Sequence, residues 1–122
     1  MTDARRVLIV EDEMMVAMLV EDMLVDEGFD VVGPAYRLSD GLRLAELEAI
    51  DIAVLDVNLN GARSFPIAAV LTDRGIPFVF ATGYGTTGVE REYPHVPVVS
   101  KPFTWGRLNE ALAKATSASS RS

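Results

Sequence analysis

Short runs of apolar residues alternate along the chain with longer stretches in which apolar positions recur every three or four residues. Five of the short runs are rich in β-forming residues and cover residues 7–10, 29–32, 52–55, 77–80 and 96–99. Most of them are continuously apolar rather than alternating, which is typical of strands that are covered on both faces. The pattern therefore predicts strands separated by helices.

The predicted helices differ in strength. Residues 12–27 carry a helical stripe before Gly28, formed by Val16, Leu19, Val20, Met23 and Leu24. Ser39 can cap a second helix that contains leucines at 42, 44 and 47, and a third runs through residues 67–71 and ends at 75–77. The last runs from about residue 104 to 115. Glycines at 83, 85 and 88 leave only residues 89–93 for a fourth helix, so we expect one or two turns at most, or a loop.

Strands that alternate with helices imply βαβ units, a parallel sheet and right-handed crossovers. We therefore expect an α/β fold of three layers, with helices on both faces of a doubly wound sheet. Met14, Met18 and Val25 fall on the side of the first helix opposite its core stripe. Such a row is either a contact surface or a set of ordinary exposed residues, and the pattern alone favours neither.

Composition narrows the function classes. The 122 residues fit one domain, which we expect to span 1–116, with a small polar tail over 117–122 that we expect to be flexible. The absence of cysteine excludes disulfides and thiol chemistry. A net charge of −7 disfavours binding to nucleic acid or an anionic membrane, and no apolar run is long enough to span one. The simplest location is the cytoplasm.

Candidate chemistry gathers where the predicted strands end. Glu11 and Asp12 follow the first strand, Asp56 the third, Thr82 the fourth and Lys101 the fifth. Sites in open parallel sheets form beyond these carboxyl ends, so the side chains should converge. Carboxylates this close repel unless a hard cation such as Mg²⁺ joins them. Asp56 would then be a nucleophile that forms an aspartyl phosphate, while Lys101 and Thr82 bind phosphoryl oxygens. The alternative is a metal-independent cluster in which Lys101 neutralises Asp56.

Four segments carry a family resemblance: residues 7–13, 54–59, 81–83 and 101–103. Together they resemble the receiver domains of two-component response regulators, in the right order and over nearly the whole chain. The resemblance implies a flavodoxin-like (βα)5 fold with strand order 2-1-3-4-5. It also implies that Asp56 is the phosphoacceptor, that Glu11 and Asp12 bind Mg²⁺, and that Asn58 adds its backbone carbonyl as a metal ligand. Thr82 matches the switch hydroxyl and Lys101 the lysine of the family pattern, whose bond to the following proline is cis.

Two positions depart from the usual family pattern. Asn60 stands where a proline is common, and Val98 stands where an aromatic residue is common. Both departures, with residues 80–85 (Phe-Ala-Thr-Gly-Tyr-Gly), resemble the FAT GUY subgroup, many of whose members are stand-alone receivers. In ordinary receivers the aromatic residue rotates when the hydroxyl moves. Val98 cannot replace it, because its χ1 is restricted. Tyr84, between two glycines, is therefore the predicted switch.

The leading hypothesis is a single-domain response regulator, not an enzyme. It would accept phosphate from a histidine kinase or a histidine phosphotransfer protein and signal to an unknown downstream protein. We expect Met14, Met18 and Val25 to contact the donor. The alternatives are a phosphate shuttle or sink, a Mg²⁺-dependent aspartyl-phosphate phosphohydrolase, and a degenerate receiver that serves as a scaffold. The phosphohydrolase is disfavoured because Asn58 stands where such enzymes usually have a second acid. We further expect His95 to be an incidental loop residue and Trp105 to pack on Phe103.

Overall fold

The computed structural model describes residues 5–83 and 88–120. Their centre is a parallel sheet in the order β2-β1-β3-β6-β7, which confirms the expected strand order. The continuous apolar runs form its strands because both faces of the sheet are covered. The bounds are β1 (Arg6–Val10), β2 (Asp30–Ala35), β3 (Ile52–Asp56), β6 (Phe78–Thr82) and β7 (Val98–Ser100).

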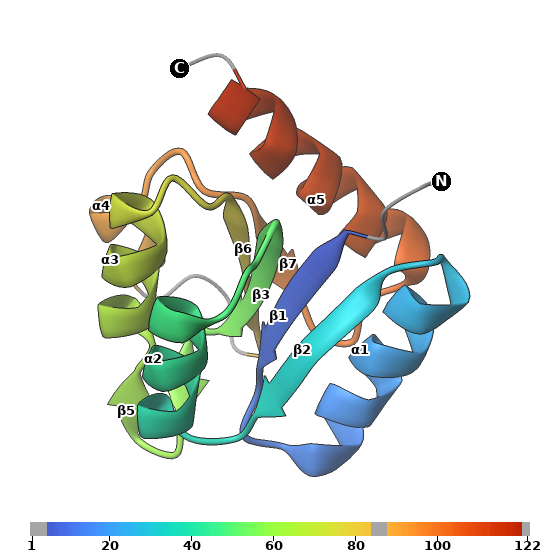
Figure 1. Ribbon diagram of the computed structural model, residues 1–122, viewed down its shortest axis with the longest axis horizontal. Coiled ribbons are helices and arrows are strands. Elements are labelled where there is room, and N and C mark those ends of the chain that lie inside the picture. Colours follow the sequence, from blue (N-terminus) through green and yellow to red (C-terminus); the bar gives the residue numbers. More distant parts are fainter. Residues whose placement is uncertain (1–4, 84–87, 121–122) are drawn as a thin grey trace.

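Helices cover both faces of the sheet, as predicted (Figure 1). One face carries α1 (Met14–Asp26) and α5 (Trp105–Ser120), and the other carries α2 (Leu38–Leu47), α3 (Phe65–Asp73) and α4 (Val89–Glu92). Successive strand side chains enter opposite layers: Leu8 and Val10 belong to the core under α2 and α3, whereas Val7 and Ile9 belong to the core under α1 and α5. No helix in the described ranges has the length and apolar character needed to cross a bilayer.

A two-stranded hairpin follows β3 and was not predicted. It consists of β4 (Asn58–Leu59) and β5 (Ala62–Arg63), which pair in antiparallel fashion. Asn60 and Gly61 form its turn with φ angles of 57° and 91°. Positive φ at two central positions is the conformation that an Asn-Gly pair adopts most readily in hairpins.

The core stripe of α1 differs from the prediction at one position. Ala17, Val20 and Leu24 are the buried residues, while Leu19 is 52% exposed. The small side chain of Ala17 faces the sheet, so the buried stripe of α1 runs through Ala17, Val20 and Leu24. Leu19 therefore lies at the margin of that stripe, and its assignment to the core was wrong.

Several helix ends also differ from the predictions. The N-cap of α2 is Arg37, so Ser39 lies within the helix and does not cap it. The last helix passes the predicted end at residue 115 and continues to Ser120, so residues 117–120 of the predicted tail are helical. No glycine or proline interrupts this stretch, and the Thr116 hydroxyl donates to the carbonyl of Leu112 at 2.9 Å. Residues 121–122 lie outside the described ranges.

Two further expectations concern the second half of the chain. The fourth helix, α4, has only four residues, which confirms the prediction of a very short element. Trp105 makes an edge-on contact with Phe29, with ring centroids 6.2 Å apart. Trp105 also packs against the core cluster that contains Phe103, so its direct packing on Phe103 stays a prediction.

Candidate functional site

The predicted acidic residues meet at the carboxyl edge of the sheet. Asp12, Asp56, Asn58, Thr82 and Lys101 line one cavity of about 140 Å³, together with residues 13 and 83. The parallel strand order brings them together, because β1, β3, β6 and β7 all end at this edge. The convergence predicted from the strand ends is therefore present in the structure.

Lys101 joins two of the carboxylates. Its Nζ lies 2.6 Å from Oε1 of Glu11 and 3.2 Å from Oδ2 of Asp56. Glu11 and Asp56 are only 4% and 6% exposed. The shorter contact is with Glu11, so Lys101 is shared between the two acids and does not simply neutralise Asp56. The lysine is itself held in place, since its backbone N–H donates to the carbonyl of Thr82 at 2.8 Å. The Lys101–Pro102 peptide bond is cis, as the resemblance implied.

Burial and a neighbouring acid perturb Asp56. Desolvation and the repulsion from Glu11 raise the pKa of Asp56 from 3.8 to about 7, although Lys101 opposes the change. Burial by itself would lower the pKa of Lys101, but its contacts with Glu11 and Asp56 outweigh burial and raise it. The site thus contains an acid that resists ionisation beside an amine that stays charged, which is a pattern found more often at functional sites than elsewhere.

The carboxylates are spaced to hold a hard cation. Glu11, Asp12 and Asp56 each offer an oxygen, and these three atoms lie within 4.8 Å of one another. Both Glu11 oxygens already have partners: Oε1 contacts Lys101, and Oε2 accepts the backbone N–H of Glu13 at 3.1 Å. The residues best placed for direct coordination are therefore Asp12 and Asp56. An all-oxygen donor set of this kind fits Mg²⁺, which retains several of its waters.

The hairpin contributes a contact that sequence reasoning missed. The backbone N–H of Asn60 donates to Oδ2 of Asp12 at 3.0 Å. The turn at Asn60 and Gly61, where both φ angles are positive, thus holds Oδ2 of Asp12 in place from a segment 48 positions away in the chain. The Asn60-Gly61 dipeptide was the available signal, because this pair marks hairpin turns.

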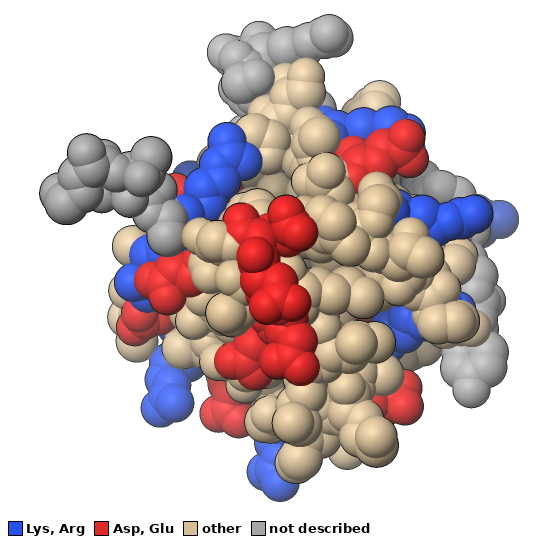
Figure 2. Space-filling view, turned by 90° about the vertical axis from the view of Figure 1, so that its right-hand side faces the viewer, with Lys and Arg blue, Asp and Glu red and all other residues tan. Residues whose placement is uncertain are grey.

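Other predicted residues lie away from this cavity. Met14 and Met18 are 60% and 53% exposed on α1, and Val25 on the same side is also exposed. Met15 and Leu19 add two further exposed apolar side chains to the helix. Figure 2 shows the face that carries α1, on which a band of acidic side chains crosses a largely uncharged surface. Tyr84, the predicted switch, lies outside the described residues.

A second hollow adjoins the acidic cavity on the α1 side. It has a volume of about 360 Å³, and the apolar residues Val16, Leu19, Val20 and Phe103 line much of it. Lys101 also lines this hollow and so borders both cavities. An apolar surface therefore begins where the carboxylates end.

The fold and this site define an α/β domain with an acidic cavity at the carboxyl edge of its parallel sheet, and comparison with known proteins identifies the family. The chain belongs to the response regulator receiver domain family, whose model matches residues 7–113. Among curated proteins, it is 31% identical over 117 residues to the transcriptional regulatory protein PdtaR of Mycobacterium tuberculosis. The match covers 93% of this chain and 57% of PdtaR, so the chain spans little more than half the length of that relative.

Solved structures of similar sequence share the fold. The solution structure of SdrG from Sphingomonas melonis Fr1 is 41% identical, with a TM-score of 0.84 over 94% of this chain and 98% of that chain. A BeF3-activated conformation of SdrG from Pseudomonas melonis Fr1 is also 41% identical, with a TM-score of 0.78 over 95% of this chain and 99% of that chain. PdtaR is a transcriptional regulatory protein, and this chain is a receiver domain of the response regulator family.

Proposed function

We propose that the chain accepts a phosphoryl group on Asp56 from a histidine kinase or a histidine phosphotransfer protein. The observation that carries the proposal is the single cavity that holds Asp12, Asp56, Asn58, Thr82 and Lys101. An Asp56 oxygen attacks the phosphorus of a phosphohistidine, the P–N bond breaks, and the imidazole leaves with the bonding electron pair. Lys101, 3.2 Å from Asp56, stabilises negative charge on the transferred phosphoryl oxygens. Thr82, which lines the same cavity, donates a hydrogen bond to them.

We propose that Mg²⁺ is the cofactor and that Asp12, Asp56 and the backbone carbonyl of Asn58 hold it, with Glu11 beside them. When bound, Mg²⁺ offsets the mutual repulsion of the carboxylates and the charge of the phosphoryl group. A pKa of about 7 leaves much of Asp56 protonated at neutral pH in the metal-free protein, and a protonated carboxyl group is a poor nucleophile. Phosphorylation should therefore require a divalent cation.

The test measures incorporation of phosphate from a phosphohistidine protein and from a small phosphodonor, with Mg²⁺ and with chelator. We expect label on the wild type only with Mg²⁺ and none on Asp56→Asn. Asp73→Asn is the matched control, because Asp73 is an exposed carboxylate on α3 away from the cavity. Label on the Asp56 variant, or equal label in chelator, would contradict the proposal.

We propose that the protein donor docks on the outer side of α1. Met14 and Met18 are exposed there, and the hollow lined by Leu19 and Phe103 continues this surface to the edge of the acidic cavity. Changing both methionines to lysine should slow transfer from the protein donor and leave the small-molecule reaction unchanged, since neither residue lines the cavity. Equal slowing with both donors would show that these residues support the fold instead.

For the output, we propose a stand-alone receiver of the FAT GUY subgroup that works in the cytoplasm and signals by phosphorylation-dependent binding to a protein. Support comes from the sequence of residues 80–85 and from Val98, which is half-buried on the edge strand and cannot act as a rotating aromatic switch. Tyr84 is the proposed switch. A phosphate shuttle or sink is the second candidate, because the same cavity would serve it. The two differ in whether Asp56 phosphate changes the affinity for a downstream protein.

A further inference from the structure

The methionines of this chain are concentrated on one helix. The sequence has five, and Met14, Met15, Met18 and Met23 all belong to α1. Met14, Met15 and Met18 are 60%, 85% and 53% exposed, whereas Met23 is partly buried against the core under α1 and α5. Of the seven large apolar side chains that are exposed among the described residues, five lie on α1. The first turns of this helix therefore present three thioether groups to solvent.

The three exposed methionines, which we call the methionine cluster, lie beside the acidic site. Met14 directly follows Glu13, which lines both the acidic cavity and the apolar hollow. Met15 is four residues from Leu19 and so neighbours it on the helix surface, and Leu19 lines the same hollow. None of the three methionines lines the acidic cavity. A change of polarity at the methionine cluster therefore alters the surface on which we place the protein donor and leaves the cavity as it is.

The methionine cluster holds the most readily oxidised side chains exposed on the described part of the chain. The sequence contains no cysteine, so no thiolate competes for oxidants. α1 carries Glu21, Asp22 and Asp26 and no lysine or arginine, and Figure 2 shows an acidic band on this face. This charge repels anionic oxidants, whereas hydrogen peroxide is uncharged at neutral pH. The exposed thioethers are therefore open to a neutral peroxide.

We propose that the methionine cluster is a modification site, at which hydrogen peroxide forms methionine sulfoxide and thereby hinders phosphate transfer from the protein donor. The thioether sulfur attacks one oxygen of the peroxide, the O–O bond breaks, and the other oxygen leaves as water. The sulfur is thus oxidised by two electrons and the peroxide is reduced. A polar sulfoxide replaces a flexible apolar group, and burying it against a donor without a hydrogen bond is unfavourable. Sulfoxide reductases reverse the change. The inference rests on the proposed docking of the donor on α1.

The test treats the full chain with hydrogen peroxide and follows each methionine by peptide mass spectrometry. We expect Met14, Met15 and Met18 to gain one oxygen well before Met23 does. Phosphate transfer is measured before and after oxidation, from a phosphohistidine protein and from phosphoramidate. In the wild type, the rate from the protein donor should fall roughly tenfold, and the rate from phosphoramidate should not change. Methionine sulfoxide reductases A and B with a thiol reductant should restore transfer.

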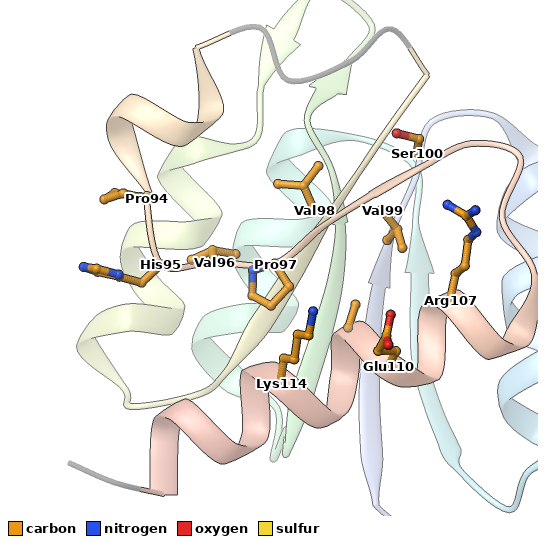
Figure 3. A pocket seen from close by; sticks show the side chains of 11 residues that line it. Pro94, His95, Val96, Pro97, Val98, Val99, Ser100, Arg107, Glu110 and Lys114 are labelled. Carbon is orange, nitrogen blue, oxygen red and sulfur yellow. The ribbon is translucent and has the colours of Figure 1, made fainter.

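Leucine variants separate the methionine cluster from other oxidisable groups. Each variant is judged by the ratio of its transfer rates after and before oxidation, so its starting rate does not enter the comparison. The variant with Met14→Leu, Met15→Leu and Met18→Leu keeps apolar side chains of similar volume and should give a ratio of about one. Met23→Leu is the matched control and should respond as the wild type does. The groove in Figure 3 has no methionine in its lining and borders β7, at the opposite edge of the sheet from β2, so the amide resonance of Val99 should not move on oxidation.

Three results would overturn the proposal. Oxidation of Met23 at the same rate as the other three would show that exposure does not select the site. An unchanged transfer rate in the oxidised wild type would show that the methionine cluster only consumes peroxide. Equal slowing with both donors would place the damage at Asp56 or in the fold. Each of these results contradicts this inference alone. The proposed function fails instead if the unoxidised wild type takes no label on Asp56 from either donor.

Discussion

Replacing Asp56 with asparagine should stabilise the metal-free fold. The ionised side chain is buried beside Glu11, and an amide of nearly the same shape removes the charge. The folded protein holds the Asp56 proton more tightly than the unfolded chain does, since the pKa rises from 3.8 to about 7 on folding. Between these values the folded state binds more protons, so the contribution of Asp56 to stability is full below pH 3.8 and falls as the pH rises toward 7.

The loss of stability caused by ionised Asp56 can be calculated from the shift in its pKa. At about 1.4 kcal/mol per pKa unit, ionising Asp56 costs the folded state about 4 kcal/mol of stability at pH 8. This figure already includes the attraction of Lys101, which lowers the pKa of Asp56. At pH 5 the same relation gives a cost of about 2 kcal/mol. The stability advantage of Asp56→Asn over the wild type should therefore grow by about 2 to 3 kcal/mol between pH 5 and pH 8.

Urea denaturation followed by circular dichroism measures this difference directly. The wild type, Asp56→Asn and the control Asp73→Asn are compared at pH 5, 6, 7 and 8 in chelator. Adding Mg²⁺ at about twenty times its Kd should then stabilise the wild type by about 1.8 kcal/mol and Asp56→Asn by much less. If the difference in unfolding free energy between wild type and Asp56→Asn does not change with pH, the claim that the buried charge of Asp56 destabilises the fold is refuted. An advantage of equal size in Asp73→Asn would refute it as well.

Three other predictions concern the scaffold and the switch. Gly33→Ala should destabilise the fold by about 2 kcal/mol more than Gly28→Ala in urea titrations. Both glycines have positive φ, but a Cβ at Gly33 would lie 2.8 Å from a backbone nitrogen, whereas one at Gly28 meets nothing within 4 Å; equal losses would contradict this. Arg74→Ala should cost about 1 to 2 kcal/mol in the same assay, because Arg74 donates to two carbonyls at the end of α2, and no loss would show that water replaces it. Tyr84→Ala should retain Asp56 phosphorylation but abolish phosphorylation-dependent partner binding; retained binding would exclude Tyr84 as the switch.

The fold was predictable because its strands and helices differ in period. The continuous apolar run at 52–55 could only be a strand covered on both faces, and the structure buries all of β3. The acids could be placed together for the same reason, since parallel strands end at one edge. Position within a helix was harder to predict. Leu19 fits a helical stripe as well as Ala17 does, and only the packing of the sheet against a small side chain selects Ala17.

Contacts within the site were not predictable from spacing. Sequence order placed Lys101 near the acids, but the closer approach to Glu11 than to Asp56 depends on side-chain geometry in three dimensions. The bond from Asn60 to Asp12 depends on a hairpin of four paired residues, which is too short to produce a recognisable alternation. The helical continuation to Ser120 was missed because small polar residues were interpreted as a tail, although nothing in them stops a helix.

The two apolar layers of the sheet have a consequence for strand register. In a sheet with one solvent-exposed face, a register shift of one residue moves every buried side chain of the strand into water. Here both faces of β3 and β6 are apolar, and a slip would only exchange residues such as Leu55 and Val54 between two cores. The polar side chains at the strand ends mark the correct alignment, because a slip would draw Asp56 or Thr82 into the apolar interior at a high desolvation cost. The residues that we assign to phosphorylation therefore also specify how the sheet assembles, and an apolar substitution at Asp56 should favour misaligned refolding even where it stabilises the native state.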